Sequence, residues 1–388
     1  MIFGFFISTT LYRLLRPFIF LFDSEAAHTY FVSIGHWLGK HPRLRGWLKH
    51  LWLVENPILS QTIAGVNFIN PVGLAAGFDY EAQLTDILPS IGFGFGTVGT
   101  ITNEPSEGNP KPRLGRLIES RSLLVNKGFK NRGLDALIQE HQTSHFAIPI
   151  GLSIGKTNSK ESATQTEAVS DIVKSFTKSE KANLPFAYYE LNISCPNLYG
   201  KIEFYSPTHL RELLTAITNL KLKKPVFIKM PISETNEAIR AMLEVISQFP
   251  VAGVIFGNLQ KDRSNPAFKS EEMKTAGPGN FSGKPTQQRS DELIKLAYKY
   301  TNGKLIIIGC GGIFSAEDAY KKIRAGASLV QLITGLVYKG PQLTAQINFG
   351  LVGFLKRDGF NNLAEAVGQD AIGPELEKDR DRCYDQLK

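Results

Sequence analysis

Eight short apolar runs, each followed by residues with helical spacing, constrain the fold of this chain more than any other feature. Repeated strand-then-helix units place their strands parallel, and eight parallel strands close into a barrel. The sequence therefore predicts an α/β fold, a (β/α)8 TIM barrel. The predicted strands lie at residues 72–76, 94–99, 148–154, 187–193, 226–230, 253–256, 305–308 and 329–333.

The alternative fold is a doubly wound open sheet. Its dinucleotide-binding form carries a G-x-G-x-x-G turn after the first strand, whereas this chain has Gly73-Leu74-Ala75-Ala76-Gly77. The barrel is therefore favoured. Between the sixth and seventh strands, residues 258–286 are rich in Gly, Pro, Ser, Asn and Lys and have no clear apolar period. We expect a long loop there, of the kind that is a functional lid or disordered.

The chain divides into three predicted parts: an amphipathic helical extension at residues 1–56, the barrel at 57–373 and a polar tail at 374–388. The extension starts with an apolar stretch that is interrupted by Arg13, Arg16 and Pro17. A membrane-spanning helix needs about 20 apolar residues, so these interruptions argue against a span.

Two short amphipathic helices are expected next in the extension. One covers residues 26–40 behind an N-cap at Ser24, and the other covers residues 44–52. They carry tryptophans on one face with cations nearby. This pattern is typical of helices that lie on a membrane surface, and packing on their own domain is the alternative interpretation.

Charge and cysteine content narrow the choice of partners. The net charge of +8 is spread along the chain without a long basic run, so no nucleic-acid partner is expected. An anionic substrate or a membrane surface explains the charge better. The three cysteines are far apart and form no CxxC pair, which predicts a reducing compartment and no metal site.

The segment Leu191-Asn192-Ile193-Ser194-Cys195-Pro196-Asn197 follows an apolar strand. Because the proline ends the strand, Cys195 lies on a loop at the barrel face where such folds keep their chemistry. A thiol with an ordinary pKa of roughly 8.5 can serve as a general base. A buried structural cysteine is the alternative, but Asn192 and Asn197 could hold a planar, amide-rich substrate beside it.

Two further features point to an anionic group at the same face. Lys229 closes the fifth strand, where it could form a Schiff base or stabilise a reduced flavin. Glycine-rich turns follow the last two strands, at residues 308–313 and at Thr334-Gly335. Such turns can bind a phosphate, and tight strand-to-helix packing is the alternative.

Several specific motifs occur together between residues 16 and 371. They are Asn70-Pro71-Val72-Gly73-Leu74-Ala75-Ala76-Gly77-Phe78-Asp79, Lys111-Pro112-Arg113-Leu114, Asn126-Lys127-Gly128-Phe129, Gly151-Leu152-Ser153-Ile154-Gly155-Lys156, residues 192–197, Ser282-Gly283-Lys284-Pro285, residues 309–313 and residues 326–331. As a set, these motifs resemble the dihydroorotate dehydrogenases, and the N-terminal helices resemble the membrane-associated, quinone-using class 2 enzymes.

This resemblance implies an FMN cofactor in the barrel, no metal, and Cys195 as the catalytic base. The implied FMN contacts are Ala76, Gly77, Thr100, Ser153, Asn192, Lys229, Gly257, Gly283, Gly312, Thr334 and Gly335. The implied substrate contacts are Tyr80, Asn126, Lys127, Gly128, Phe129, Asn192, Asn197, Asn258 and Leu259.

The chain departs from the family pattern at several of these positions. Class 2 members have serine where this chain has Cys195, and class 1 members have cysteine. Tyr80 replaces a lysine and Leu259 a threonine, while Gly257 and Ser153 replace other polar residues. Loss of a cation beside a carboxylate should cost about 1.5 to 3 kcal/mol. We expect Lys127, Lys130 or Arg132, which follow in one turn, to compensate.

The resemblance implies FMN-dependent oxidation of dihydroorotate to orotate in pyrimidine biosynthesis, with electrons passed to a quinone. Cys195 would take the C5 proton while hydride leaves C6 for FMN. The enzyme would be a peripheral protein of a bacterial or organellar inner membrane, facing a reducing compartment. The alternatives are an FMN oxidoreductase of the same fold acting on another dihydropyrimidine or enone, a Schiff-base aldolase, and a non-enzymatic FMN-binding or membrane-tethering module.

Overall fold

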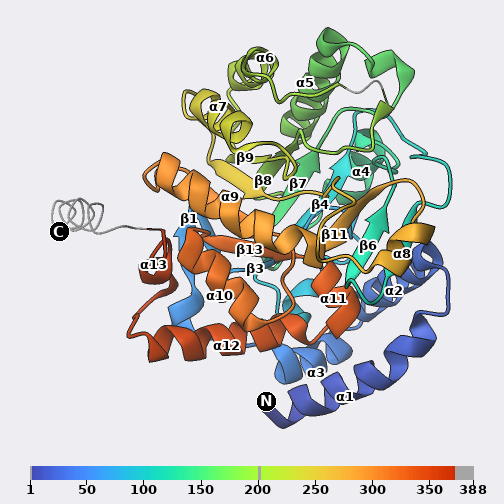
Figure 1. The fold of residues 1–388 in the computed structure, drawn as a ribbon, viewed down its shortest axis with the longest axis vertical. Coiled ribbons are helices and arrows are strands. Elements are labelled where there is room, and N and C mark those ends of the chain that lie inside the picture. The colour runs from blue at the N-terminus through green and yellow to red at the C-terminus, as the bar shows by residue number, and fades with distance from the viewer. Residues whose placement is uncertain (1, 200–201, 372–388) are drawn as a thin grey trace.

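The computed structural model describes residues 2–199 and 202–371 of the chain. The barrel strands are β3 (Val72–Leu74), β4 (Phe95–Ile101), β7 (Ile150–Ile154), β8 (Tyr188–Asn192), β9 (Val226–Lys229), β10 (Gly253–Phe256), β12 (Ile306–Cys310) and β13 (Leu329–Leu332). They close in the order β10-β12-β13-β3-β4-β7-β8-β9, and the neighbouring strands are parallel (Figure 1). The predicted (β/α)8 barrel is confirmed.

Aromatic rings fill the barrel interior, and glycines in the strands make room for them. Phe95 and Tyr188 are almost completely buried. A Cβ atom on Gly151 would lie 2.1 Å from the Tyr188 ring, so this strand position requires glycine. The Phe68 ring packs edge-on to Phe95 at 5.3 Å and closes the N-terminal end of the barrel. It comes from a hairpin of β1 (Gln61–Ile63) and β2 (Val66–Phe68).

Helices surround the barrel because each buries one apolar face against it. They are α4 (Leu134–His141), α5 (Gln165–Ala182), α6 (Pro207–Asn219), α7 (Asn236–Ile246), α9 (Gln287–Tyr300), α10 (Ala316–Ala325), α11 (Thr334–Lys339) and α12 (Leu343–Arg357), with 3-10 turns at Pro57–Leu59, Leu88–Ile91, Lys160–Ser162 and Lys284–Thr286. Side chains define several helix starts: Thr164 and Glu167 form a capping box on α5, and Ser315 caps α10.

The prediction of a long loop at residues 258–286 is wrong. This segment holds α8 (Ser270–Thr275) and β11 (Asn280–Gly283), and β11 pairs antiparallel with β6 (Ser122–Val125). Together with β5 (Leu114–Leu117) they form a small sheet above the barrel. The local pattern missed this pairing because its partner is more than 150 residues away and only Phe281 of β11 is a large buried apolar residue.

The N-terminal extension forms α1 (Ile2–Ile19), α2 (Ser24–Gly39) and α3 (Pro42–Trp52) beside the barrel (Figure 1). The two predicted helices are present, but the N-cap expected at Ser24 is Asp23, whose carboxylate accepts from the backbone N–H of Glu25 and Ala26. The Tyr12 hydroxyl donates to the Val337 carbonyl at 2.6 Å and ties α1 to α11. Among the described residues, no helix is long and apolar enough to cross a membrane.

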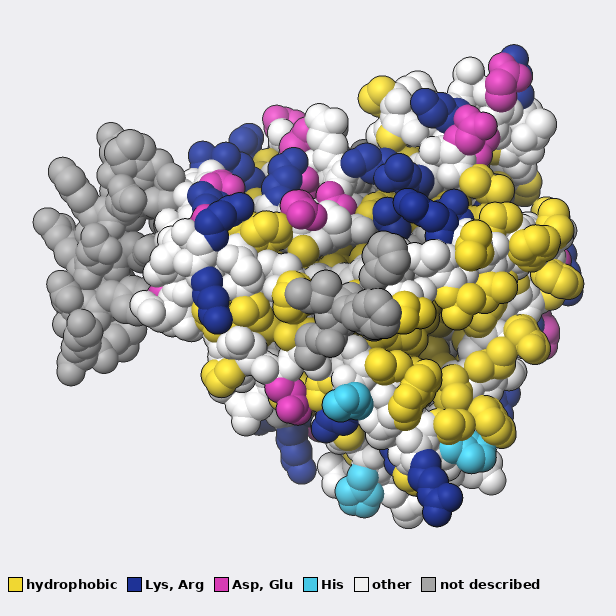
Figure 2. All heavy atoms as spheres, turned by 90° about the horizontal axis from the view of Figure 1, so that it is seen from below, with side chains coloured by type: hydrophobic (Ala, Val, Ile, Leu, Met, Phe, Trp, Pro, Cys, Tyr) yellow, Lys and Arg dark blue, Asp and Glu magenta, His cyan; other side chains and the backbone are white. Residues whose placement is uncertain are grey.

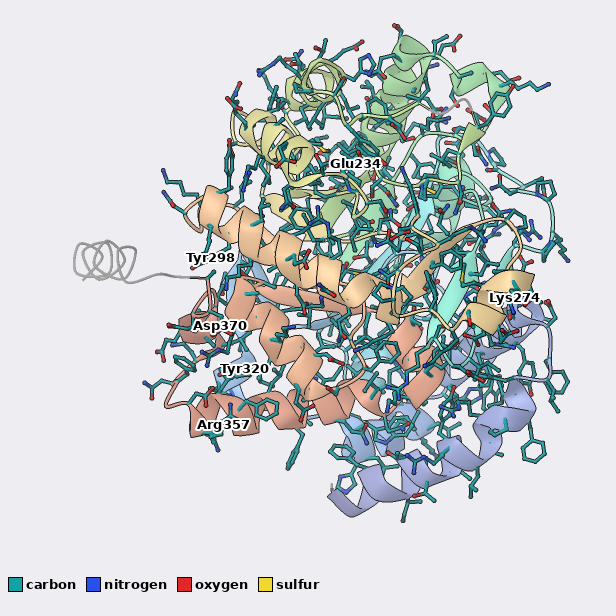
Figure 3. The ribbon with its side chains drawn as sticks, in the orientation of Figure 1. Glu234, Lys274, Tyr298, Tyr320, Arg357 and Asp370 are labelled. Carbon is teal, nitrogen blue, oxygen red and sulfur yellow. The ribbon has the colours of Figure 1, made fainter. Side chains whose placement is uncertain are left out.

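A polar cluster fixes the last described turn of the chain, after α13 (Leu363–Ala366). Tyr320, Arg357 and Asp370 lie close together in Figure 3. Arg324 and Asp358 connect them. Arg324 pairs with Asp370 at 2.6 Å and with Asp358 at 3.1 Å, and Tyr320 donates to Asp358 at 2.7 Å. These contacts join the chain end to α10 and α12. The tail predicted at residues 374–388 lies outside the described residues.

Candidate active site

A cavity of about 510 Å³ opens between the carboxyl ends of the barrel strands and helices α1–α3. Most of the predicted site residues line it, although they come from distant parts of the chain. They are Ala76, Gly77, Tyr80, Thr100, Lys127, Gly128, Phe129, Asn192, Cys195, Asn197, Lys229, Asn258 and Leu259. The fold therefore brings together the candidate base, the cation of the fifth strand and the amides.

Cys195 is a half-buried thiol on the loop after β8. Burial raises its pKa to about 11, against the opposing effects of the Asn197 backbone N–H and the Lys229 and Lys156 ammonium groups. The thiol is therefore protonated at neutral pH in this structure. To act as a base it must lose its proton, which higher pH or a bound partner of suitable charge would favour.

Asparagine side chains around Cys195 are held by hydrogen bonds. Asn192 Nδ2 donates to Thr100 Oγ1 at 2.8 Å, and Asn258 Nδ2 donates to Ser194 Oγ at 2.8 Å. Asn197 Nδ2 donates to the Val125 carbonyl at 3.0 Å. Fixed amides of this kind can present donors and acceptors to the edge of a planar ring with little ordering cost.

The small sheet adds Asn280 to this group, a residue that the sequence reasoning missed. Its Nδ2 donates to Asn197 Oδ1 at 2.7 Å. The available signal was its position on β11, three residues before the Gly283 of a quoted motif. Asn126 does not line the cavity; its Oδ1 accepts from Asn109, which also donates to the Asn197 carbonyl.

Lys229 has a buried carboxylate beside it that the sequence analysis did not single out. Its Nζ lies 3.7 Å from Glu190 Oε1, and Ser153 Oγ donates to the same oxygen at 2.7 Å. Ser153 also bonds Thr100 Oγ1 at 2.9 Å, so it lies behind the cavity wall. Glu190 Oε2 is buried without a hydrogen-bond partner among the described residues. The Glu190 carboxylate thus lies beside the Lys229 ammonium at the barrel mouth.

Of the three cations expected to replace the missing lysine, Lys127 alone lines the cavity. Its Nζ lies 4.6 Å from the centre of the Tyr80 ring and 3.9 Å from Glu25 Oε1. Lys130 is exposed, and Arg132 pairs with Glu81 and Glu140 at the surface. Lys127 is therefore placed where it could supply the missing positive charge, and Arg132 is not.

Electrostatics around Lys127 are set by α2. Burial lowers the pKa of Lys127 to about 8, and the Glu25 carboxylate opposes this shift. Glu25 also pairs with Arg113 at 3.1 Å. Burial and the nearby Lys127 charge lower the pKa of His28 to about 4, so this imidazole is neutral at physiological pH. Glu25 of α2 is thus the only carboxylate within 4.0 Å of this ammonium among the described residues.

The remaining predicted cofactor residues lie beside the cavity rather than on its wall. Thr334 Oγ1 bonds Ser282 Oγ at 2.8 Å, and Ser282 does line the cavity. Gly312 has φ +70°, and a Cβ there would lie 2.3 Å from Gln287 Cβ. Close packing thus requires glycine at Gly312, while Thr334 contacts the cavity wall through Ser282. The others in this group are Gly257, Gly283 and Gly335.

The far end of the cavity is apolar and belongs to the N-terminal helices. Leu15, Phe31, Leu38 and Trp52 line it. Arg116 also lines the cavity and donates to the carbonyls of Phe20 and Phe22 after α1. The cavity therefore joins a polar chamber over the strands to an apolar passage under α1–α3. Among the described residues, no group of three or more His, Cys, Asp and Glu side chains is arranged to hold a metal ion.

Comparison with known protein families shows the family to which the chain belongs. The sequence profile described as dihydroorotate dehydrogenase matches residues 58–355, which is most of the barrel. The chain belongs to the dihydroorotate dehydrogenase family. A dihydroorotate dehydrogenase (quinone) from Trichodesmium erythraeum is 36% identical, over 89% of this chain and 94% of the relative. The same-named protein from Roseiflexus sp. is 37% identical, over 93% and 98%.

Solved structures agree with this family assignment. The dihydroorotate dehydrogenase of Eimeria tenella in complex with ferulenol has a TM-score of 0.80 and 29% identity, covering 90% of this chain and 96% of that one. Its ligand-free form gives a TM-score of 0.78 and 30% identity. Membership in this family makes the chain an oxidoreductase, and the resemblance of the sequence motifs is confirmed.

Proposed function

We propose that this enzyme oxidises dihydroorotate to orotate in pyrimidine biosynthesis, uses bound FMN, and passes the electrons to a quinone. The single observation that carries the proposal is the placement of Cys195, Asn192 and Lys229 on one cavity at the carboxyl ends of the strands, in a chain of this family. That face is where barrel enzymes hold their substrates.

The polar chamber suits a flavin mononucleotide. Lys229, Thr100 and Asn192 offer a cation, a hydroxyl and an amide, and Gly77 has φ +106°, which brings backbone close to the cavity. Thr334 bonds Ser282, and Gly283 and Gly335 adjoin these two residues in the chain. Backbone N–H groups of these turns, and of the turn at Gly312, would hold the phosphate. Ser153 positions Thr100, and Gly257 follows β10 beside Asn258. When bound, FMN supplies the hydride acceptor.

The amides and the thiol would together hold the substrate ring. Asn197 and Asn258 would bind its amide edge, with Asn126 behind them and Gly128, Phe129 and Leu259 along the wall. Cys195 Sγ would take the C5 proton. The nearby ammonium groups of Lys229 and Lys156 favour the thiolate that this step needs. Proton transfer to a positioned side chain of this kind typically contributes a factor of roughly 10² to 10⁴ in rate.

The substrate carboxylate is assigned to Lys127. Tyr80 occupies the position where the family has a lysine, and its ring faces the Lys127 ammonium. A cation over an aromatic face keeps free N–H donors on its other side. Lys127 would therefore restore the missing positive charge from a neighbouring loop.

The apolar passage under α1–α3 suits the quinone and a peripheral position on a membrane. Exposed apolar side chains of α1 such as Leu14 and Phe18, which are 64% and 66% exposed, would enter the lipid surface. A quinone could then reach the passage from the membrane. We infer a peripheral enzyme on a bacterial or organellar inner membrane, facing a reducing compartment.

A steady-state assay tests this function. Purified protein is given L-dihydroorotate and a short-chain quinone, orotate formation is followed, and the flavin is extracted and identified by chromatography. We expect FMN and orotate. FMN without orotate formation, together with turnover of another dihydropyrimidine, would favour the alternative that Tyr80 and Leu259 suggest, a related enzyme with a different ring substrate.

A further inference from the structure

A second and smaller cavity, of about 230 Å³, lies between α1, the turn joining β5 to β6, and the end of α11. Four cations line it: Arg13, Arg16, Arg121 and Lys339. Among the described residues that line this cavity, none is acidic. It is separate from the chamber of Cys195, although Tyr12 borders both cavities.

The four charges have no compensating partner nearby. Among residues 2–199 and 202–371, no carboxylate lies within 4.0 Å of any of them. The Arg16 guanidinium donates to the Tyr338 carbonyl at 3.1 Å, which fixes its direction. Burial together with Arg121, Arg13 and Arg16 lowers the pKa of Lys339, opposed weakly by Asp318. The cations therefore face one another across the cavity.

The surface beside this cavity is apolar. Leu11, Leu14, Leu15 and Phe18 of α1 are each 47% to 66% exposed. Figure 2, which views the molecule from the side of α1, shows hydrophobic side chains gathered over this end, with lysine and arginine side chains beside them. A phosphate-sized cationic hollow next to exposed apolar side chains is what a molecule with an anionic head and apolar tails requires.

We propose that this cavity binds the phosphate of an anionic phospholipid, whose acyl chains lie on the exposed side chains of α1. Guanidinium groups match phosphate oxygens in geometry and charge, and a membrane surface alone provides phosphate and apolar chains together. The inference rests on the proposed membrane contact of α1–α3 and deepens it. Because Tyr12 borders both cavities, the proposed lipid site adjoins the apolar passage.

Vesicle binding of two variants tests this site without changing α1. In Arg121→Gln/Lys339→Gln, both replaced residues are exposed and lie outside α1, so the apolar contact of that helix is unaltered. Lys174→Gln/Lys299→Gln removes the same charge from exposed positions on α5 and α9. The holoenzyme is sedimented with vesicles of phosphatidylcholine alone or mixed with phosphatidylglycerol. Thermal unfolding confirms that each variant is folded, and the single variant Arg121→Gln, which also leaves α1 unchanged, serves as a reserve.

We expect the first variant to lose affinity for the phosphatidylglycerol vesicles by about fivefold per charge and to bind phosphatidylcholine as the parent does. Equal losses in the control pair would show a diffuse charge effect and overturn the site. Inorganic phosphate that raises the melting temperature of the parent alone, without competing with vesicles, would assign the cavity to a free phosphate and also overturn it. Reduction of a soluble dye by dihydroorotate, measured without vesicles, reports separately on the proposed function.

Discussion

The ammonium group of Lys127 lies 4.6 Å from the centre of the Tyr80 ring, on the wall of the large cavity. The resemblance of the sequence motifs places a family lysine at the position of Tyr80, so the proposed replacement cation contacts the position that it would replace. Tyr80, which departs from the expected pattern, is thus in contact with Lys127, the cation proposed to compensate for it. This pair is also linked to α2 through Glu25, 3.9 Å from the Lys127 ammonium.

Replacing Lys127 should weaken orotate binding. Lys127→Met removes the cation proposed to bind the carboxylate, and a charge-assisted hydrogen bond contributes about 1.5 to 3 kcal/mol, so the dissociation constant should rise roughly ten- to a hundredfold. The constant is measured from the change in flavin absorbance on adding orotate. Lys130→Met is the matched control, because it removes an exposed cation from the same turn. Equal effects in both variants would contradict the assignment.

Orotate binding should also weaken at alkaline pH. Lys127 has a pKa lowered to about 8 by burial, so the charged form that binds a carboxylate is present below this pH and is lost as the pH rises through it. In Lys127→Arg the guanidinium stays charged, and binding should remain constant over the same range. A pH-independent dissociation constant in the unaltered protein would exclude Lys127 as the carboxylate partner.

The rate of the proton-transfer step should increase with pH. Burial raises the pKa of Cys195 to about 11, so the fraction of thiolate, which is the base, grows about tenfold per pH unit below that value. The limiting rate of flavin reduction at saturating dihydroorotate separates this effect from the binding effect at Lys127. In Cys195→Ser we expect a slower reaction whose inflection leaves the accessible pH range. An inflection in the parent below the ordinary thiol value of roughly 8.5 would be contrary to this account.

Replacements of Glu190 and Lys229 should have strongly non-additive effects on the free energy of unfolding. Glu190→Gln leaves the buried Lys229 ammonium without its carboxylate at 3.7 Å, and breaking one side of a buried pair costs about 3 to 5 kcal/mol. Urea unfolding measures the loss in free energy of unfolding. The double variant Glu190→Gln/Lys229→Met should be less destabilised than the sum of the two single variants. Additive losses would mean that the two side chains do not interact.

Much of the barrel could be predicted from the sequence, because its strands are continuous apolar runs and the strand-helix alternation is regular. Cys195, Asn192 and Lys229 could be placed for the same reason, since each stands at or just after a strand end. The N-cap of α2 lies one residue before the predicted Ser24, because Ser24 and Asp23 are both good capping residues and only Asp23 reaches the free N–H groups.

The β11–β6 pairing could not be predicted, because it joins segments far apart in sequence and neither has a long apolar run. The contacts of Lys127 with Glu25 and of Lys229 with Glu190 could not be predicted for a related reason. An acidic residue at a helix start, or within a strand, looks ordinary until the fold brings a cation to it. The sequence offered three candidates to replace the lost lysine, and only the packing of α2 and the pairing of Arg132 with Glu81 and Glu140 distinguished among them.

The most direct test of the central claim is a single-turnover reaction. The purified holoenzyme is mixed anaerobically with L-dihydroorotate, and the absorbance of the oxidised flavin is followed with time. We predict rapid bleaching that is lost in Cys195→Ala, is slowed in Cys195→Ser and is reversed by a short-chain quinone. A folded, flavin-loaded protein that does not bleach, or a Cys195→Ala variant that bleaches at the parent rate, would contradict the account.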